Sequence, residues 1–219
     1  MDKPLNLNEE RRTQAERTAL SDRRMLETAI ALIVERGSGK TTLKEVGERA
    51  GYSRGLASYR FGSKAGLLSF VVRAIGDEWL HELTSVTEGK IGIDAIHAAT
   101  EAHFRFVQDA PDHVRAFYIL WFESISPGSD VRNHIVRVHQ RRGRDVASWI
   151  AQGIEAGVVN AEILPREIAD QFSSSIIGIV YHWLVNPGAV EQLRGMHDGL
   201  KSTMQMLLTN HQPLGPSPL

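Results

Sequence analysis

The residue types that can read DNA gather between positions 42 and 61, in the stretch TLKEVGERAGYSRGLASYRF. Two short helices are expected there, at 42–50 and 54–60, with Gly51 at a turn that needs a positive φ. Gly47 is a small residue where the second helix must cross the first closely. Any helical hairpin with a glycine turn shares this pattern, so the spacing alone leaves a plain structural hairpin as an alternative.

The second of these helices carries polar side chains that suit a nucleic acid. A major groove admits one α-helix, and its base edges offer acceptors to Arg and Ser side chains. Phosphates attract Lys, hydroxyl groups, Tyr and helix N-termini. We expect Arg54, Ser58 and Arg60 to point outward. The candidate DNA-binding residues are Thr42, Lys44, Ser53, Arg54, Gly55, Ser58, Tyr59, Arg60 and Lys64.

The distribution of charge favours the same chemistry. The 219 residues carry a net charge of −1, but residues 1–76 hold 14 Lys and Arg against 9 Asp and Glu, whereas residues 77–219 hold 11 against 17. A basic N-terminal third on an acidic body indicates a polyanion-binding module attached to a part with another role.

Two stretches carry a closer resemblance: TTLKEVGERAGYSRG at 41–55 and FGSKAGLL at 61–68. With them, residues 21–70 resemble the DNA-binding domain of the TetR family of bacterial transcriptional regulators. The resemblance implies a sequence-specific transcriptional regulator, acting as a repressor. It also implies a dimer that binds a palindromic double-stranded operator and is released by a small hydrophobic or aromatic effector.

The chain departs from the family pattern at the end of the second motif helix. Ser58 stands where the family usually has tyrosine, Arg60 where it has His or Tyr, and Gly62 where proline is common. The usual tyrosine–phosphate contact then passes either to Tyr59 or to Ser58 and Arg60 together.

Outside the motif the sequence also predicts helices, so the fold class is all-α with about nine helices. No stretch alternates apolar and polar residues convincingly, and no Asn-Gly or Asp-Gly hairpin turn occurs. Apolar spacing and stop signals predict the other helices at 21–36, from 64 onward, and at 93–108, 111–125, 130–156, 165–185 and 189–208.

Four segments are expected along the chain. Residues 1–19 are polar and predict a flexible N-terminal arm, with Ser21 as the cap of the first helix. Residues 20–66 form the helix-turn-helix domain, and residues 67–211 form a helical effector-binding and dimerisation domain. Residues 212–219, rich in proline, predict a disordered tail.

Large rings concentrate in the middle helices, where the family resemblance implies an effector pocket. Rings with a few polar groups suit a drug-sized ligand, although a single ring at helical spacing is more often plain core. The candidate effector-binding residues are His103, Phe104, Phe117, Tyr118, Trp121, Phe122, Trp149 and His182.

The last two helices are the candidates for dimerisation. The helix at 165–185 is apolar nearly all round, and the helix at 189–208 has one apolar side. Two such helices from each subunit make a four-helix bundle across a two-fold axis. The candidate interface residues are Phe172, Ile176, Ile179, Trp183, Leu193, Leu200, Met204 and Leu207.

Several kinds of chemistry are excluded or not expected. Cysteine is absent, which removes disulfides, Cys-ligated zinc, iron–sulfur clusters and a Cys nucleophile. The stretch GSGKT at 37–41 fails as a phosphate loop because Val34 stands where that pattern needs glycine. We expect no metal site and no cofactor, and we interpret the basic cluster at 141–144 as a solvated helix face.

A cytoplasmic protein without a membrane partner is expected, because no apolar run reaches the length of a membrane-spanning helix. An enzyme is not expected, because no acid–base or nucleophile constellation occurs. The alternative function is a helical protein that sequesters a hydrophobic small molecule and keeps a vestigial DNA motif. The presence of Thr42, Lys44, Arg54 and Lys64 argues against this alternative.

Overall fold

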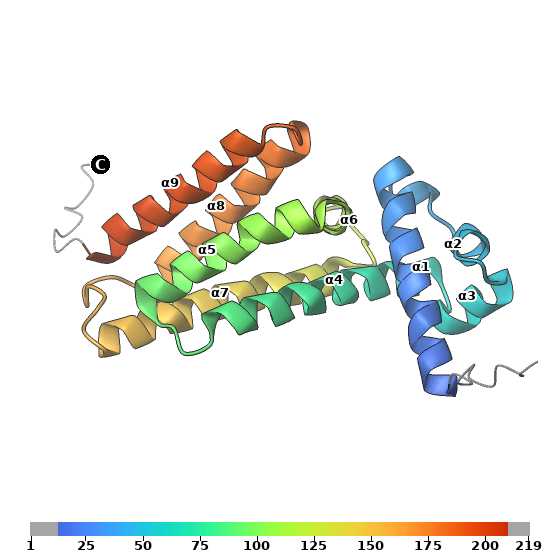
Figure 1. Cartoon of the computed structure of the whole chain (residues 1–219), viewed down its shortest axis with the longest axis horizontal. Helices are drawn as coiled ribbons and strands as arrows, with labels where there is room; N and C mark the ends of the chain where they lie inside the picture. The colour runs from blue at the N-terminus through green and yellow to red at the C-terminus, as the bar shows by residue number, and fades with distance from the viewer. Residues whose placement is uncertain (1–12, 210–219) are drawn as a thin grey trace, which may run out of the picture. The chain divides into compact units, whose positions relative to one another are not determined.

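The computed structural model describes residues 13–209, and within this range the chain forms nine α-helices, one short 3-10 turn and no strand (Figure 1). The all-α prediction is confirmed. Residues 1–12 of the predicted arm and the predicted tail at 212–219 lie outside the described range. The helices are α1 (Gln14–Arg36), α2 (Leu43–Arg49), α3 (Arg54–Phe61), α4 (Lys64–Thr87), α5 (Gly92–Asp109), α6 (Pro111–Glu123), α7 (Arg132–Glu155), α8 (Pro165–Val185) and α9 (Val190–Thr209), with the 3-10 turn at Ser38–Lys40.

The first helix begins earlier than the sequence pattern predicts. Residues 14–19, expected in the arm, are the first residues of α1. The cap is Thr13, whose hydroxyl accepts from the Glu16 backbone N–H at 3.2 Å, while the Glu16 carboxylate accepts from the Thr13 N–H at 2.7 Å. This reciprocal capping box satisfies two free donors at the helix start and replaces the expected cap at Ser21.

The chain divides into two compact units, residues 1–71 and residues 72–219. The first unit holds α1, α2, α3 and the start of α4. The second unit holds the rest of α4 and the five helices that follow it. The predicted domain boundary at 66/67 falls inside α4, as the division at 71/72 does.

The N-terminal unit is built on one small apolar core. Met25 and Ile33 of α1, Val46 of α2 and Ala57 of α3 are all fully buried. Burial of such side chains is the main favourable term for a unit of this size. The core therefore holds α3 in place by one side only, which leaves its other side open.

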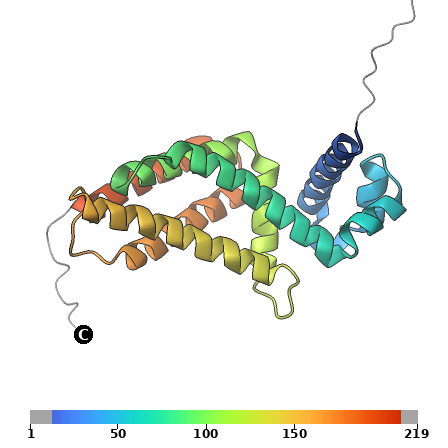
Figure 2. The same cartoon turned by 90° about the horizontal axis from the view of Figure 1, so that it is seen from below.

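In the second unit, α5 packs against α6, α7 and α9, and α8 packs against both α7 and α9. Figure 2 shows α4 and α7 running beside each other along this unit. The close approach of α5 to α7 depends on two glycines. A Cβ atom on Gly153 would lie 2.9 Å from the Cα of Gly92 and 2.6 Å from Cγ2 of Val159, closer than side-chain atoms allow.

Candidate nucleic-acid interface and internal cavity

The turn between α2 and α3 has the geometry that a helix-turn-helix requires. Gly51 has a φ of 82°, in the left-handed region that favours glycine. A Cβ atom on Gly47 would lie only 2.8 Å from the backbone oxygen of Ser53, so the two helices meet at van der Waals contact there. Both glycines therefore occupy positions where a larger residue would be strained.

Helix α3 presents a polar face that no other part of the described chain covers. Ser53 caps it, with its hydroxyl accepting from the Leu56 N–H at 3.1 Å. Arg54 and Gly55 in its first turn are exposed, and the Tyr59 side chain is 86% exposed. A tyrosine that remains almost wholly in water is available to an outside partner.

Helix α2 adds two of the predicted residues at its start. The Thr42 hydroxyl accepts from the Glu45 N–H at 3.3 Å and donates to its carboxylate at 3.0 Å, which fixes the cap. Lys44 is exposed, and its Nζ lies 4.0 Å from a carboxylate oxygen of Glu48. At that distance the ion pair is weak, so the amine is free to exchange it for a phosphate.

Two other predicted residues are held by the chain itself. Arg60 was expected to point outward, but its Nε lies 2.8 Å from Oδ1 of Asp22 on α1. Lys64 Nζ donates to the backbone oxygen of Gly39 at 2.6 Å. Ser58 is half-buried. Of the residues proposed to replace the family tyrosine, Tyr59 is therefore the one left exposed.

The second unit contains a cavity of about 320 Å³ that is partly open to solvent and is lined by α4, α5, α7 and α8. A smaller cavity of about 30 Å³ is lined by α4, α5, α6 and α7. Both are lined by His103, whereas Trp149 lines the larger cavity only, and Phe117 and Tyr118 line the smaller one only. These four are the predicted effector residues that the fold brings to a cavity.

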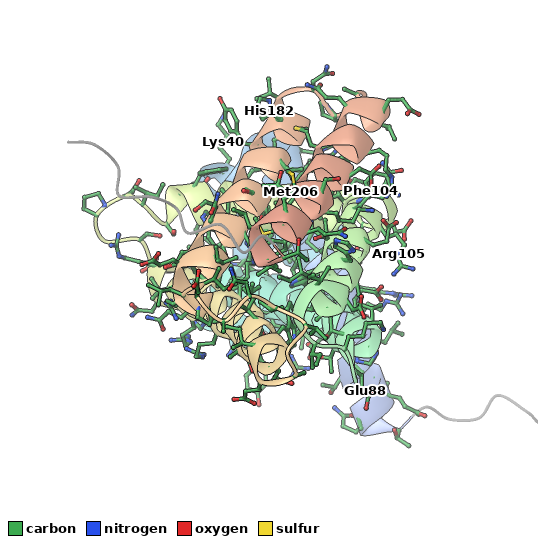
Figure 3. The ribbon with its side chains drawn as sticks, turned by 90° about the vertical axis from the view of Figure 1, so that its left-hand side faces the viewer. Lys40, Glu88, Phe104, Arg105, His182 and Met206 are labelled. Atoms are coloured by element: carbon green, nitrogen blue, oxygen red, sulfur yellow. The ribbon has the colours of Figure 1, made fainter. Side chains whose placement is uncertain are left out.

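The remaining four predicted effector residues line neither cavity. Phe104 is buried, with the guanidinium carbon of Arg194 3.4 Å from its ring centroid. Trp121 is buried beside other rings, and Phe122 is 38% exposed. His182 lies on an exposed side of α8 and is labelled in Figure 3. Aromatic composition places rings in the correct helices without telling which face of each helix meets the cavity.

The sequence reasoning missed the charged lining of the larger cavity. It consists of Arg73, Asp77, His134, Arg137, Arg141, Arg142 and Asp145. The interpretation of 141–144 as a solvated face is wrong for Arg142, whose Nη1 atom is buried and whose guanidinium lies 5.6 Å from the Trp121 ring centroid. The signal was available, because Arg142 stands four residues from both Val138 and Val146 and so shares their helix face.

A pair of buried histidines joins α5 to α9 beside the cavities. Nδ1 of His197 lies 2.8 Å from the Leu193 backbone oxygen, which can only accept, so this nitrogen carries a hydrogen. Nε2 of His197 lies 2.9 Å from Nδ1 of His103. Burial lowers the pKa of His103 well below its ordinary value and also lowers the pKa of His197. Both rings are then neutral at pH 7, and His103 Nδ1 donates to His197.

The predicted dimer residues need correction. All of them except the half-buried Leu207 are buried within this chain, and Phe172 and Ile176 line the larger cavity. The apolar side chains of these seven buried residues are already covered within their own chain. The exposed side of the same two helices carries a different set of residues: Ser174, Gly178, Tyr181 and Val185 on α8, and Gly195, Gly199 and Met206 on α9 (Figure 3, where Met206 is labelled).

Two features are absent from residues 13–209. No group of three or more His, Asp or Glu side chains in this range is arranged to hold a metal ion. None of the described helices is long and apolar enough to cross a membrane.

Comparison with known proteins connects these features to a family. Residues 25–70 match the family model described as bacterial regulatory proteins, tetR family. Among curated proteins, the uncharacterized HTH-type transcriptional regulator YvkB of Bacillus subtilis (strain 168) is 26% identical over 164 residues, which cover 75% of this chain and 83% of that protein.

Two solved structures show how widely the fold is shared. A transcriptional regulator of Saccharomonospora viridis in complex with choline is 20% identical, with a TM-score of 0.75 over 88% of this chain and 100% of that one. The SmeT–triclosan complex is 19% identical, with a TM-score of 0.71 over 91% of this chain and 98% of that one. The similarity therefore extends through the second unit as well as the motif.

Proposed function

The chain belongs to the tetR family of bacterial regulatory proteins, and we propose that it is a repressor that binds a palindromic operator as a dimer and leaves it when a small effector binds. The observation that carries this proposal is the uncovered face of α3, where Arg54, Gly55 and Tyr59 are exposed beside an intact turn. A helix of this kind fits the major groove.

Each exposed residue has a distinct role in the proposal. Arg54 reads a base edge, because its guanidinium can donate twice to a guanine. Gly55 lets the DNA approach the helix backbone closely. Tyr59 and Lys44 bind phosphates, which fix the orientation of α3 without reading sequence. Arg60 supports α3 from behind through Asp22.

We place the second subunit on the exposed side of α8 and α9. A Cβ atom added to Gly178, Gly195 or Gly199 would meet no atom within 4 Å, so none of the residues 13–209 covers these positions. Exposed small residues let another helix approach, and a two-fold axis repeats the contact on both subunits. Two α3 helices related by that axis would read half-sites about 34–36 Å apart or a multiple of it.

The larger cavity is the proposed effector site, since about 320 Å³ lies within the usual size range of small-molecule pockets. Helix α4 supplies the link to DNA binding. It begins with Lys64 in the first unit and lines the cavity with Gly76 and Trp79 in the second. An effector that prefers one position of α4 shifts the equilibrium between states that fit the operator and states that do not.

The test is binding of the purified protein to the DNA that flanks its own gene, measured across a salt series. We expect selective binding with a steep salt dependence, as for a protein that displaces several counterions. Arg54→Ala should reduce this selectivity. Binding no tighter than to random DNA of equal length, together with retained ligand binding, would favour the alternative of a sequestering protein with a vestigial motif.

A further inference from the structure

Two residues that line the smaller cavity each carry a buried hydrogen-bond donor without an acceptor. Nη1 of Arg142 and Oη of Tyr118 are both inaccessible to solvent and make no hydrogen bond within the described residues. Both residues line the smaller cavity, and Tyr118 is only 3% exposed. A buried donor left without a partner is unfavourable, and more so when it is charged. Two such donors at one cavity point to an occupant that accepts from both.

The charge of Arg142 is not balanced by its surroundings. The acidic residues that line the larger cavity are Asp145, whose Oδ2 lies 3.6 Å from Nε of Arg141, and the exposed Asp77. No ion pair joins Arg142 to a carboxylate in residues 13–209. Its one recorded partner is the Trp121 ring. The site therefore holds a half-buried guanidinium with one buried nitrogen, Nη1, and a bound anion would neutralise its charge.

The neighbouring His103 is uncharged, so it neither balances the charge of Arg142 nor adds to it. The pKa of His103 is lowered by burial first, and then by His197 and by Arg142 itself. Its ring is therefore neutral at pH 7. Because His103 is neutral, the guanidinium of Arg142 is the charged group among the residues that line both cavities.

The two cavities share that wall. Gly76, Trp79, His103, Val138 and Arg142 line both. The larger cavity is flanked by the rings of Trp79, Trp149 and Phe172, which suit an apolar body. The smaller one has about the volume of a single water in the liquid, which suits a small planar group.

We propose that the effector is an organic carboxylate. Its carboxylate accepts from Nη1 of Arg142 and Oη of Tyr118, and its aromatic or other apolar body lies in the larger cavity against Trp79 and Trp149. Charge-assisted hydrogen bonds from a guanidinium to a carboxylate are roughly twice as strong as those between neutral groups. The inference rests on the proposed function for the regulatory role of the cavity, but its binding chemistry is independent of DNA.

The test compares ligands that differ in charge and little else. Binding of 2-naphthoate and its neutral amide, and of octanoate and its amide, is measured by calorimetry on the full chain without DNA. In the wild type we expect at least one carboxylate to bind about tenfold or more tighter than its amide, the range of a charge-assisted bond. Arg142→Met should abolish this preference, and Tyr118→Phe should weaken carboxylate binding several-fold.

The matched control is Arg144→Met. Arg144 is an exposed arginine on the same helix, and it lines neither cavity. It should bind like the wild type. Equal binding of acids and amides by the wild type, or no saturable binding of either carboxylate, overturns the proposal and leaves buried water as the partner of Arg142. The wild-type comparison decides the question even if Arg142→Met fails to fold.

The two proposals fail in different ways. Carboxylate-selective binding by a protein that shows no preference for the DNA flanking its gene would refute the repressor and keep the ligand class. Selective DNA binding that is released by a neutral amide and by neither acid would refute the ligand class and keep the repressor.

Discussion

Nε of Arg60 lies 2.8 Å from Oδ1 of Asp22, so the last turn of α3 is tied to the side of α1. Both side chains are about 30% exposed. The pair therefore contributes modest stability, because solvent still screens it. Its main consequence is geometric, since it fixes the direction in which the exposed face of α3 points.

Arg60→Ala should accordingly affect folding more than direct recognition. We expect the N-terminal unit to lose about 1 kcal/mol or less in urea unfolding, and operator affinity to fall less than in Arg54→Ala. Urea titration and fluorescence anisotropy on the same preparations measure both. Loss of operator binding equal to that of Arg54→Ala, at unchanged stability, would show that Arg60 contacts DNA.

Tyr59→Phe tests the phosphate contact by removing one hydroxyl group. The side chain is 86% exposed, so the fold should not change. We expect affinity to fall by a similar factor on operator and on random DNA, because phosphates carry no sequence information. Arg54→Ala should instead reduce operator affinity selectively, by about 1–3 kcal/mol. A selective loss in Tyr59→Phe would assign Tyr59 to a base edge.

Gly47→Ala and Gly55→Ala form a matched pair in the motif. Alanine favours a helix over glycine by about 1 kcal/mol at either position. At Gly47 the new Cβ lies 2.8 Å from a backbone oxygen, so we expect net destabilisation. At Gly55 its nearest neighbour is the Ser53 hydroxyl at 3.6 Å, an ordinary contact, so stability should be kept or rise slightly while DNA affinity falls. Thermal unfolding and anisotropy separate the two results.

Gly178→Glu and Gly199→Glu test the proposed subunit contact. Because a Cβ at either position meets no atom within 4 Å among the described residues, each variant should fold normally. We expect both to sediment as monomers at concentrations where the wild type is a dimer. The control is Ser85→Glu on an exposed side of α4. Dimers in both glycine variants would place the partner elsewhere.

The buried histidine pair predicts acid sensitivity. Burial holds the pKa of His103 and of His197 below the ordinary 6.5, so the unfolded chain binds protons there before the folded chain does. Stability is therefore present above pH 6.5 and is lost as the pH falls below it, by up to about 1.4 kcal/mol per pH unit for each ring. His103→Gln should flatten this dependence in urea unfolding between pH 7.5 and 5. An unchanged slope would show that His103 accepts its proton while folded; His182→Gln, exposed on α8, is the control.

Local patterns predict the helices well, because caps, glycine stops and apolar spacing act within a few residues. The start of α1 was missed because the polar run at 13–19 lacks an apolar stripe, although Thr13 and Glu16 encode its cap. The boundaries of α8 match the prediction, since Pro165 starts it and Asn186 ends it.

Contacts between residues that are far apart in the sequence could not be predicted from local patterns. Apolar periodicity predicts that Phe172 and Ile176 are buried, as the structure shows. It does not tell whether the surface that covers them belongs to the same chain or to a second subunit. The contact between His103 and His197 joins residues 94 positions apart, and no local rule predicts it. Arg142 could be predicted in part. Its spacing from Val138 and Val146 places it on their helix face, but only the tertiary structure shows that this face lines a cavity.

The exposed face of α3 also bears on how DNA specificity evolves in such a protein. Arg54 and Tyr59 make no recorded hydrogen bond or ion pair with the rest of residues 13–209, whereas Arg60 is committed to Asp22. Substitutions at the first two positions should therefore leave folding nearly untouched. Under the proposed function, a change at Arg54 alters which base is read, and a change at Tyr59 alters the affinity for phosphates. Arg60 is constrained by its contact with Asp22, so new specificities are expected to arise from substitutions at neighbouring positions and not at Arg60 itself.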